Sequence, residues 1–349
     1  MLHSCLKRSA GLRLGIAVAL LLFLPPLPVA SETLRIQSAF PRGDLSMELL
    51  QRFAVAAGEK SGGQLSVEVF ADPEIVPMEQ LFGAVQRGTI QMLQGAGVLW
   101  RGIIPAANIE FGLPMAYRID RALDFEAQAR KLREFFYREG FVALLRKEYA
   151  DRGLYLLDIH TYGPVPFVLA TAPLRTCDDL KGRRIRSDGL NHAFHAGVGM
   201  QGVSMSALET YAALRRGDID AAGWDVSAVT GLRWQEAAPY WIRGFENDQC
   251  LGHILVNLET WTALTPEKKD ALRAAGEAYW HATVRGYKKE METVRRLIRQ
   301  KRLTEVWLEP ACREAYGRVA RNLWDQAAAE DETSARLVEI LKKWHAVPH

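Results

Sequence analysis

Cysteine is scarce in this chain, and the few cysteines present are not spaced for metal binding. Four of the 349 residues are cysteine, and no two of them form a CxxC pair. Because paired thiolates at that spacing are common ligands of structural zinc, we do not expect a zinc-stabilised fold. Cys177, Cys250 and Cys312 lie far apart, which allows one disulfide and one free thiol in an oxidising compartment. Their spacing does not favour any one pair.

The chain also lacks a large excess of charge and the common catalytic motifs. Its formal net charge is only +3, whereas a nucleic-acid-binding protein usually carries a strong basic excess, so we expect no nucleic-acid partner. No GxSxG elbow, phosphate-binding glycine loop or HExxH motif occurs in the sequence. His192 and His195 have helical spacing but no third ligand at a recognisable distance, so we interpret them as independent side chains. We therefore expect that the protein is not an enzyme.

Long apolar runs are absent except near the start of the chain. There, Lys7, Arg8 and Arg13 precede or flank the apolar run Leu14–Leu24, which is too short to span a bilayer. Small residues follow at 29–31, so the pattern is typical of a cleaved signal peptide over residues 1–31. We expect export to the periplasm and a soluble mature chain. An uncleaved membrane anchor is the alternative.

Strand and helix signals alternate most regularly between Asp178 and Asp225. Ser206 and Glu209 have the capping-box spacing of a helix start, and Gly217 is placed to end that helix. Alternating elements of this length predict an α/β fold with a parallel sheet. The predicted order is a polar lead-in at 178–182, a strand at 184–186, a helix at 191–197, an extended piece at 203–205, a helix from 207 and a strand at 219–222.

Part of this segment has an echo earlier in the chain. Residues 80–91 read QLFGAVQRGTIQ, and residues 209–220 read ETYAALRRGDID. Gly88 matches Gly217, and Ile90 matches Ile219. One explanation is coincidence between two ordinary helix–glycine–strand units. The other is that each of two lobes carries one copy, which would place a ligand cleft at the carboxyl ends of their strands.

Two further regions bear on the overall plan. Thr265 and Pro266 are typical of a helix start, and the helical pattern continues to about Lys301. At about 1.5 Å per residue this helix would be about 54 Å long, enough to brace two lobes. Residues 120–149 are interpreted as a long charged helical region with a solvated outer face. The expected boundaries are 32–157 and 246–265 for lobe one, 158–245 for lobe two, 266–301 for the bracing helix, and 302–349 for a closing strand and helices.

Two short patterns are similar to those of a known family. Asp179–Arg186 reads Asp-Leu-Lys-Gly-x-x-Ile-Arg, and Glu-x-Tyr-x-Ala-Leu-x-x-Gly-x-hydrophobic-Asp follows at 209–220. The chain resembles the extracytoplasmic solute receptors of tripartite ATP-independent periplasmic (TRAP) transporters, the DctP-like family, over essentially all of its mature length. This resemblance implies a two-lobed α/β fold like that of periplasmic binding proteins, with a ligand cleft between the lobes and a long helix bracing both.

The same resemblance implies a function. A receptor of this family binds a small organic acid, a carboxylate, in the interlobe cleft. It then delivers the acid to the membrane subunits of a TRAP permease and performs no reaction. The alternatives are a module that presents its ligand to a membrane sensor, or an exported enzyme.

Arg186 is the leading candidate for ligand binding. Its planar guanidinium fork matches a carboxylate in two parallel hydrogen bonds, and in the family that the chain resembles the arginine ending this motif binds the ligand carboxylate.

Trp224 should lie where a strand opens into the cleft, and its ring would cover a ligand's apolar body. Tyr162 is the only polar side chain in the segment 162–166, which favours a monocarboxylate with an apolar body. A surface arginine, a core tryptophan and a packed loop tyrosine are the plainer interpretations. Further cleft candidates by position are Asn191, Trp100, Asp248 and Gln249.

The sequence does not favour a bound cation. One branch of the similar family binds 2-oxo and 2-hydroxy acids with a cation and also has tryptophan at the position of Trp224. In that branch an acid just before the tryptophan ligates the metal, whereas this chain has Gly223 there. Asp225 is a weak substitute, so we expect no cofactor.

The signal-peptide hypothesis is directly testable. We expect the chain recovered from the periplasm to begin near Ala30 or Ser31, because small residues there follow the apolar run. Amino-terminal sequencing of that protein measures the cleavage point. A periplasmic chain that still begins at Met1 would contradict cleavage.

Overall fold

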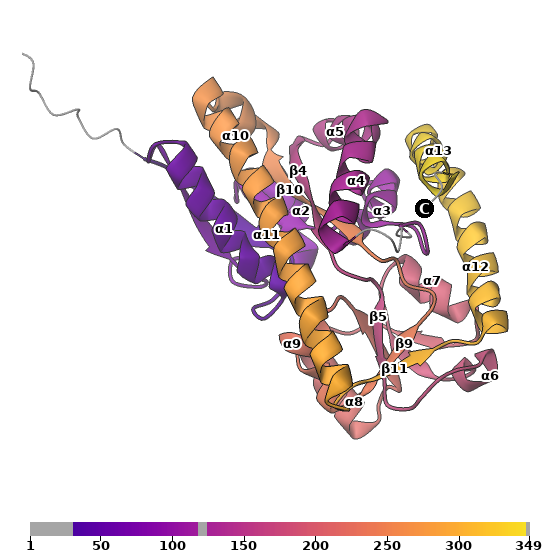
Figure 1. Ribbon diagram of the computed structural model, residues 1–349. Helices are drawn as coiled ribbons and strands as arrows, with labels where there is room; N and C mark the ends of the chain where they lie inside the picture. Colours follow the sequence, from indigo (N-terminus) through magenta and orange to yellow (C-terminus); the bar gives the residue numbers. More distant parts are fainter. Residues whose placement is uncertain (1–30, 118–123, 347–349) are drawn as a thin grey trace, which may run out of the picture.

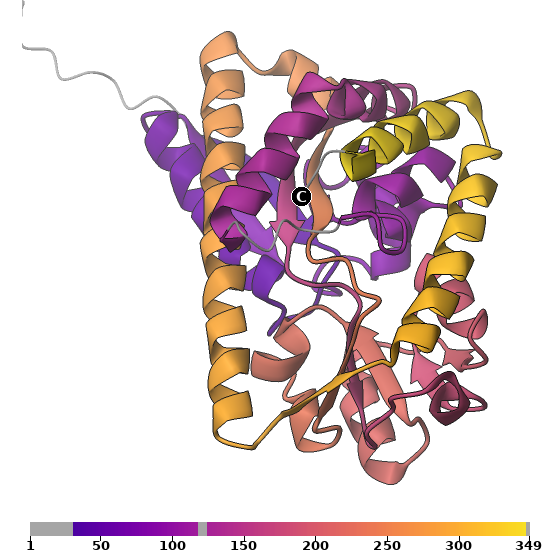
Figure 2. The same ribbon diagram turned by 45° about the vertical axis from the view of Figure 1, so that its right-hand side comes forward.

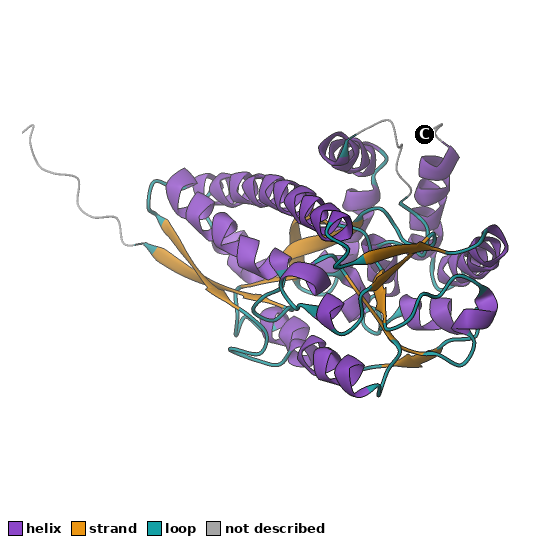
Figure 3. Cartoon of the chain, turned by 60° about the horizontal axis from the view of Figure 1, so that its bottom comes forward, coloured by secondary structure: helices purple, strands orange, loops and turns teal. Residues whose placement is uncertain are grey.

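The strands of this computed structural model build two mixed sheets, one in the upper and one in the lower half of Figure 1. The structure describes residues 31–117 and 124–346, so the expected signal peptide lies outside the described residues except for its last position. In Figure 3 the helices are distributed around the strands of both sheets. Within the described ranges, no helix is both long enough and apolar enough to cross a bilayer.

Lobe one is built on a sheet with the strand order β2-β1-β3-β10-β4. Its strands are β1 (Glu32–Ser38), β2 (Leu65–Phe70), β3 (Met92–Gly95), β4 (Leu154–Tyr162) and β10 (Cys250–Asn257). Its helices are α1 (Leu45–Lys60), α2 (Met78–Gln86), α3 (Pro105–Phe111), α4 (Phe125–Arg138), α5 (Phe141–Ala150) and α10 (Leu258–Ala263), with a 3-10 turn at Gly97–Trp100.

Lobe two is built on a sheet with the strand order β11-β9-β5-β8-β6-β7. Its strands are β5 (Phe167–Ala170), β6 (Arg184–Arg186), β7 (Gln201–Val203), β8 (Ala221–Trp224), β9 (Tyr240–Arg243) and β11 (Thr304–Trp307). Its helices are α6 (Cys177–Leu180), α7 (Leu190–Ala196), α8 (Ala207–Arg216) and α9 (Ser227–Thr230), with a 3-10 turn at Trp234–Glu236. Three more helices, α11 (Pro266–Arg299), α12 (Pro310–Ala328) and α13 (Glu332–Ala346), follow in the chain.

The sequence echo corresponds to a structural unit that occurs once in each lobe. Strands β2-β1-β3 and β7-β6-β8 are parallel and follow the same order, and in each sheet two antiparallel strands continue from the third. Helices α2 and α8 also end alike: the backbone N–H of Thr89 donates to Ala84 and that of Asp218 to Ala213, both at 2.9 Å. Gly88 (φ 72°) and Gly217 (φ 76°) make the left-handed turn that ends each helix. The repeated-lobe interpretation therefore fits the structure better than coincidence.

The long helix α11 runs along both halves of the molecule in Figure 1, and its side chains pack in the cores of both lobes. It begins where the sequence predicts, with the Thr265 side chain accepting from the backbone N–H of Lys268 and Pro266 in the first turn. Leu272 and Tyr279 pack with the core under β1 and β10. Farther along, Val294 packs with the core of lobe two beside Trp241. Burial in two separate cores fixes the helix as a brace.

Two short segments connect β4 to β5 and β9 to β10, and they lie side by side. The backbone N–H of Val165 donates to Asn247 at 3.0 Å, and the N–H of Asn247 donates back to Val165 at 2.9 Å. The expected boundary at residue 157 falls inside β4, because that strand continues to Tyr162. The first crossing between the lobes therefore comes later in the chain than expected.

Two segments differ in detail from the sequence predictions. The region 120–149 is helical over most of its described part and exposes an outer face, but it breaks at Gly140 (φ 82°) into α4 and α5. The inner faces of these helices are buried, with Phe136, Phe141 and Tyr149 inaccessible to solvent; residues 120–123 lie outside the described residues. The polar lead-in at 178–182 contains the short helix α6, which a capping box between Thr176 and Asp179 begins.

Helices α12 and α13 also connect the lobes. Tyr316 of α12 packs in the core of lobe two, and Leu341 of α13 packs in the core of lobe one. Figure 2 shows α11 and α12 on opposite sides of the molecule. A disulfide between Cys177 and Cys312 ties α6 to α12, and Cys250 is a free, buried cysteine. The structure thus selects one pair among those that the sequence left open.

This disulfide should stabilise the fold measurably. It closes a separation of 135 residues, so replacing both cysteines by alanine should lower the free energy of unfolding by roughly 2–5 kcal/mol. Urea unfolding without reductant compares the double variant with the parent. Reductant should destabilise the parent and leave the variant unchanged, whereas equal midpoints for the two oxidised proteins would contradict the prediction.

Candidate functional site

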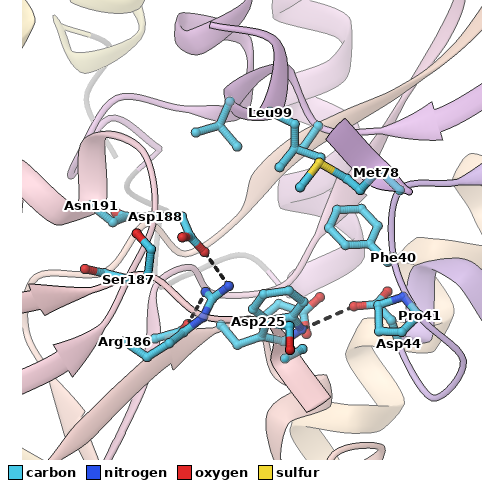
Figure 4. Close-up of a pocket in the computed structure, with 18 of the residues that line it drawn as sticks. Phe40, Pro41, Asp44, Met78, Leu99, Arg186, Ser187, Asp188, Asn191 and Asp225 are labelled. Atoms are coloured by element: carbon cyan, nitrogen blue, oxygen red, sulfur yellow. Dashed lines mark hydrogen bonds and ion pairs between the residues drawn. The ribbon is translucent and has the colours of Figure 1, made fainter. Parts of the chain in front are cut away.

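A cavity of about 520 Å³ lies between the two lobes, and both contribute to its wall. Phe40, Met78 and Leu99 come from lobe one, while Arg186 and Trp224 come from lobe two. In Figure 4 the apolar side chains of lobe one face the polar group around Arg186. A volume of this size is typical of small-molecule sites, which commonly combine apolar walls with a few polar groups.

Arg186 lies at the end of β6 and is almost completely buried, with only 8% of its side chain exposed. Its Nε donates to the carbonyl of Met205 at 3.1 Å, and its Nη1 donates to that of Gly223 at 3.2 Å. Its Nη2 forms an ion pair with Asp188. Burial lowers the pKa of Arg186, and the neighbouring Asp188 carboxylate opposes that shift. The guanidinium is thus held rigidly at the cavity wall.

Aromatic side chains flank this arginine. The ring of Trp224 lies under the guanidinium, with 4.6 Å between the Arg186 Cζ and the ring centroid, which is a favourable cation–π distance. Phe40 contacts both Trp224 and Tyr162 edge to face, with ring centroids 6.1 and 5.8 Å apart. The Tyr162 hydroxyl accepts from the Gln94 side chain at 3.1 Å, behind the cavity wall. These contacts fix the orientation of the rings that line the cavity.

The sequence-predicted residues fall into two groups. Arg186, Trp224, Tyr162 and Asn191 all line the cavity, whereas Trp100, Asp248 and Gln249 do not. Trp100 points into the core of lobe one and donates from its indole nitrogen to His253 at 2.9 Å.

The other two lie near the chain crossings. The Gln249 amide donates to the Phe125 carbonyl at 3.2 Å and accepts from the Thr161 hydroxyl at 2.9 Å. The backbone N–H of Asp248 donates to the Tyr117 carbonyl at 3.1 Å. Both were expected to face the ligand cleft, but neither lines the cavity, and these hydrogen bonds hold the segments near the crossings instead.

Several polar residues that line the cavity were missed, and three of them lie close to Arg186 or on the next helix. Ser187 and Asp188 directly follow Arg186 at the end of β6, and His195 lies on α7. The Ser187 hydroxyl and the His195 Nε2 are buried and have no hydrogen-bond partner among the described residues. Burial lowers the pKa of His195 to about 3, so this imidazole is neutral at physiological pH. The position of Ser187 and Asp188 next to Arg186 was the available signal.

The sequence also matches a known family. The model of family 7 of the bacterial extracellular solute-binding proteins, DctP, matches residues 37–331. The chain belongs to the DctP family. The expected family resemblance is therefore confirmed.

The chain is similar to several proteins with known ligands or known structures. A monocarboxylate 2-oxoacid-binding periplasmic protein of Nostoc sp. is 25% identical over 245 residues, which cover 69% of this chain and 64% of the Nostoc protein. A TRAP periplasmic solute-binding protein from Chromohalobacter salexigens, with bound (S)-(+)-2-amino-1-propanol, has a TM-score of 0.81 at 21% identity, covering 91% of this chain and 96% of that one. One from Colwellia psychrerythraea, with bound calcium and pyruvate, has a TM-score of 0.81 at 20% identity, covering 91% and 95%. These likenesses confirm the two-lobed α/β fold.

A pair of buried carboxyl groups joins the lobes beside the cavity of this DctP-family chain. Asp44 caps α1 in lobe one by accepting from the N–H of Ser46 at 2.9 Å, and Asp225 follows β8 in lobe two. The Ser227 hydroxyl contacts both, at 3.4 Å from Asp44 and 2.5 Å from Asp225. Tyr287 of α11 donates to Asp225 at 2.8 Å. Burial, and next the charge of Asp225, raise the pKa of Asp44 to about 7, and burial also raises the pKa of Asp225.

This pair does not make a ready metal site. Within residues 31–117 and 124–346, no group of three or more potential ligands among His, Cys, Asp and Glu could hold an ion. Both oxygens of Asp225 already accept hydrogen bonds, from Ser227 and from Tyr287. Cys250 is also unsuited to act as a nucleophile, because burial raises the pKa of its thiol far above the ordinary value.

The raised pKa of Asp44 predicts a pH-dependent stability. The folded protein holds a proton that the unfolded chain releases above about pH 4, so this group's contribution is full at low pH and is lost as the pH rises towards 7. Asp44→Asn keeps an equally good helix cap without the charge. We expect its free energy of unfolding to change less between pH 5 and pH 8, and to exceed that of the parent at pH 8.

Urea unfolding of both proteins at the two pH values measures this difference. Asp124→Asn is the matched control, because Asp124 also caps a helix by accepting from a backbone N–H but is exposed. It should leave the pH dependence unchanged. If Asp44→Asn keeps the pH dependence of the parent, another group is responsible.

Proposed function

We propose that this DctP-family chain is a periplasmic receptor that captures a small organic acid and delivers it to the membrane subunits of a TRAP permease. The observation that carries the proposal is a buried guanidinium, Arg186, at the wall of a largely apolar interlobe cavity. A buried cation favours a ligand with a carboxylate. The 2-oxoacid-binding Nostoc relative and the pyruvate bound in the Colwellia structure support this ligand class.

The cavity wall favours a ligand with one carboxylate and an apolar body. Opposite Arg186, Met78 and Leu99 offer no charged group (Figure 4). A second carboxylate there would lose water without gaining a donor, which is costly. We infer a monocarboxylate rather than a highly polar sugar acid.

Binding without reaction is part of the proposal. The lobes would close on the ligand by bending at the crossings between them, and closure would exclude water and strengthen the charge-assisted hydrogen bonds to Arg186. The proposal includes a cleaved signal peptide and no catalytic step. It also includes no cofactor: calcium accompanies pyruvate in the Colwellia structure, but Gly223 has no side chain to ligate a cation and the Asp225 oxygens are occupied.

Substitution of Arg186 tests the carboxylate anchor. A thermal-shift screen of organic acids first identifies a ligand, because binding to the folded state raises apparent stability. Arg186→Ala should then weaken binding by about 2–5 kcal/mol, or roughly thirty-fold to several thousand-fold. Arg186→Lys should restore only part, because one ammonium cannot reproduce the planar fork. Calorimetric titration measures the three affinities.

Arg183→Ala is the matched control. Arg183 lies on the same stretch of chain but is exposed, and it is 3.5 Å from Asp220 on the outside of lobe two. Its removal should change the affinity little. An Arg186→Ala variant that is folded and binds the acid as tightly as the parent would overturn the anchor.

A further inference from the structure

The charged side chains around the cavity are mostly acidic. Among the described residues, the lining contains one arginine and five carboxyl-bearing residues, which are Arg186, Asp44, Asp72, Glu79, Asp188 and Asp225. Glu79 is exposed on α2. Asp44 and Asp225 are buried, and the Ser227 hydroxyl lies within hydrogen-bond distance of both carboxyl groups. A site that binds only anions would have more basic than acidic side chains in its wall.

Arg186 is also neutralised before any ligand arrives. Its Nε and Nη1 donate to the carbonyls of Met205 and Gly223, and its Nη2 pairs with Asp188. A ligand carboxylate that binds this guanidinium therefore meets the Asp188 carboxylate on the same group. Two like charges this close repel each other, and the low dielectric of a closed cavity increases the repulsion.

A ligand that carries its own positive charge removes this conflict. Its carboxylate takes the place of Asp188 on Arg186, and its cation takes the place of Arg186 on Asp188, so every charge keeps a partner. The Asp188 side chain is 45% exposed, so it can be reached by a bound molecule. The buried Ser187 hydroxyl, which has no partner among the described residues, offers a further donor to the ligand carboxylate.

We propose that the preferred ligand is a zwitterion with an apolar body, such as an apolar α-amino acid, with its carboxylate on Arg186 and its ammonium on Asp188. This inference rests on the proposed function, because it assumes that Arg186 binds a carboxylate. A simple monocarboxylate leaves Asp188 facing an added anion. A dicarboxylate adds a second anion to a cavity where, among the described residues, Arg186 is the only lysine or arginine and the buried His195 is neutral.

Matched probes separate the charge of the ligand from its size. One set is L-leucine, 4-methyl-2-oxopentanoate and 4-methylpentanoate, and a second is L-phenylalanine, phenylpyruvate and 3-phenylpropanoate. Each set keeps one carbon skeleton and changes only the group at C2. Calorimetric titration uses ligand-free protein in EDTA. In at least one set we expect the amino acid to bind at least tenfold more tightly than both partners.

Asp188→Asn should change the order of affinities. It removes the partner of the ammonium and the repulsion toward a plain carboxylate, so the amino acid should bind at least tenfold more weakly and the deaminated acid more tightly. Asp178→Asn is the control: Asp178 is in the same lobe, pairs with Lys181 on the surface and does not line the cavity. Melting curves of each variant check the fold.

Several outcomes would overturn the zwitterion proposal. One is a 2-oxo or deaminated acid that binds the parent as tightly as its amino acid. Another is tight 2-oxo acid binding that appears only when calcium or sodium replaces EDTA, because the ion would then supply the positive charge. Binding of other organic acids from the screen through Arg186, with no binding of either amino acid, rejects the zwitterion and leaves the proposed function intact. No binding of any acid would reject both.

Discussion

The site depends on the protein oxygen atoms that hydrogen-bond to one buried positive charge, the Arg186 guanidinium, in place of water. A guanidinium inside a protein needs oxygen atoms around it, and two of those around Arg186 are backbone carbonyls, of Met205 and Gly223. Gly223 belongs to β8 and Met205 to the loop before α8, so both carbonyls are placed by the strand–helix–strand unit that lobe two shares with lobe one. The fold of that unit and the position of the charge are therefore one constraint. A shift of β8 against β6 would move the Gly223 carbonyl away from Arg186 and leave the guanidinium without that hydrogen bond.

Local sequence signals located most of the fold. Caps and helix stops act over a few residues, so Ser206, Thr265 and Gly217 marked their helix ends correctly. Strand limits were less accurate: the strand expected at 219–222 begins at Ala221, because pairing with β5 and β6 decides where it starts. In the helical region 120–149 the charged residues indicated a solvated side, but the sequence analysis did not anticipate the apolar face that packs with Leu341 of α13 in the core of lobe one.

The site was harder to predict because it depends on side-chain direction. Arg186, Trp224 and Tyr162 could be placed at the cleft from motif and strand position, and the structure lines the cavity with them. Trp100 also comes shortly after a strand, β3, but its indole N–H donates a hydrogen bond to His253, which is 153 positions away in the sequence. A pattern of neighbouring residues does not predict a contact between residues so far apart in the sequence. Asp188 was overlooked because an acid beside a binding arginine looks like an ordinary surface pair until its exposure and the cavity are known.

The hydrogen-bonded crossing at Val165 and Asn247 has a mechanical consequence. Within the described residues the chain passes between the lobes four times: the paired crossing supplies two passages, α11 supplies the third and the α12–α13 turn the fourth. Bodies tied at several points cannot slide or separate, so the soft motion left to them is a rotation about an axis near the ties. Such a rotation works as a lever, because a small twist at the paired strands moves the far rim of each lobe through a much longer arc.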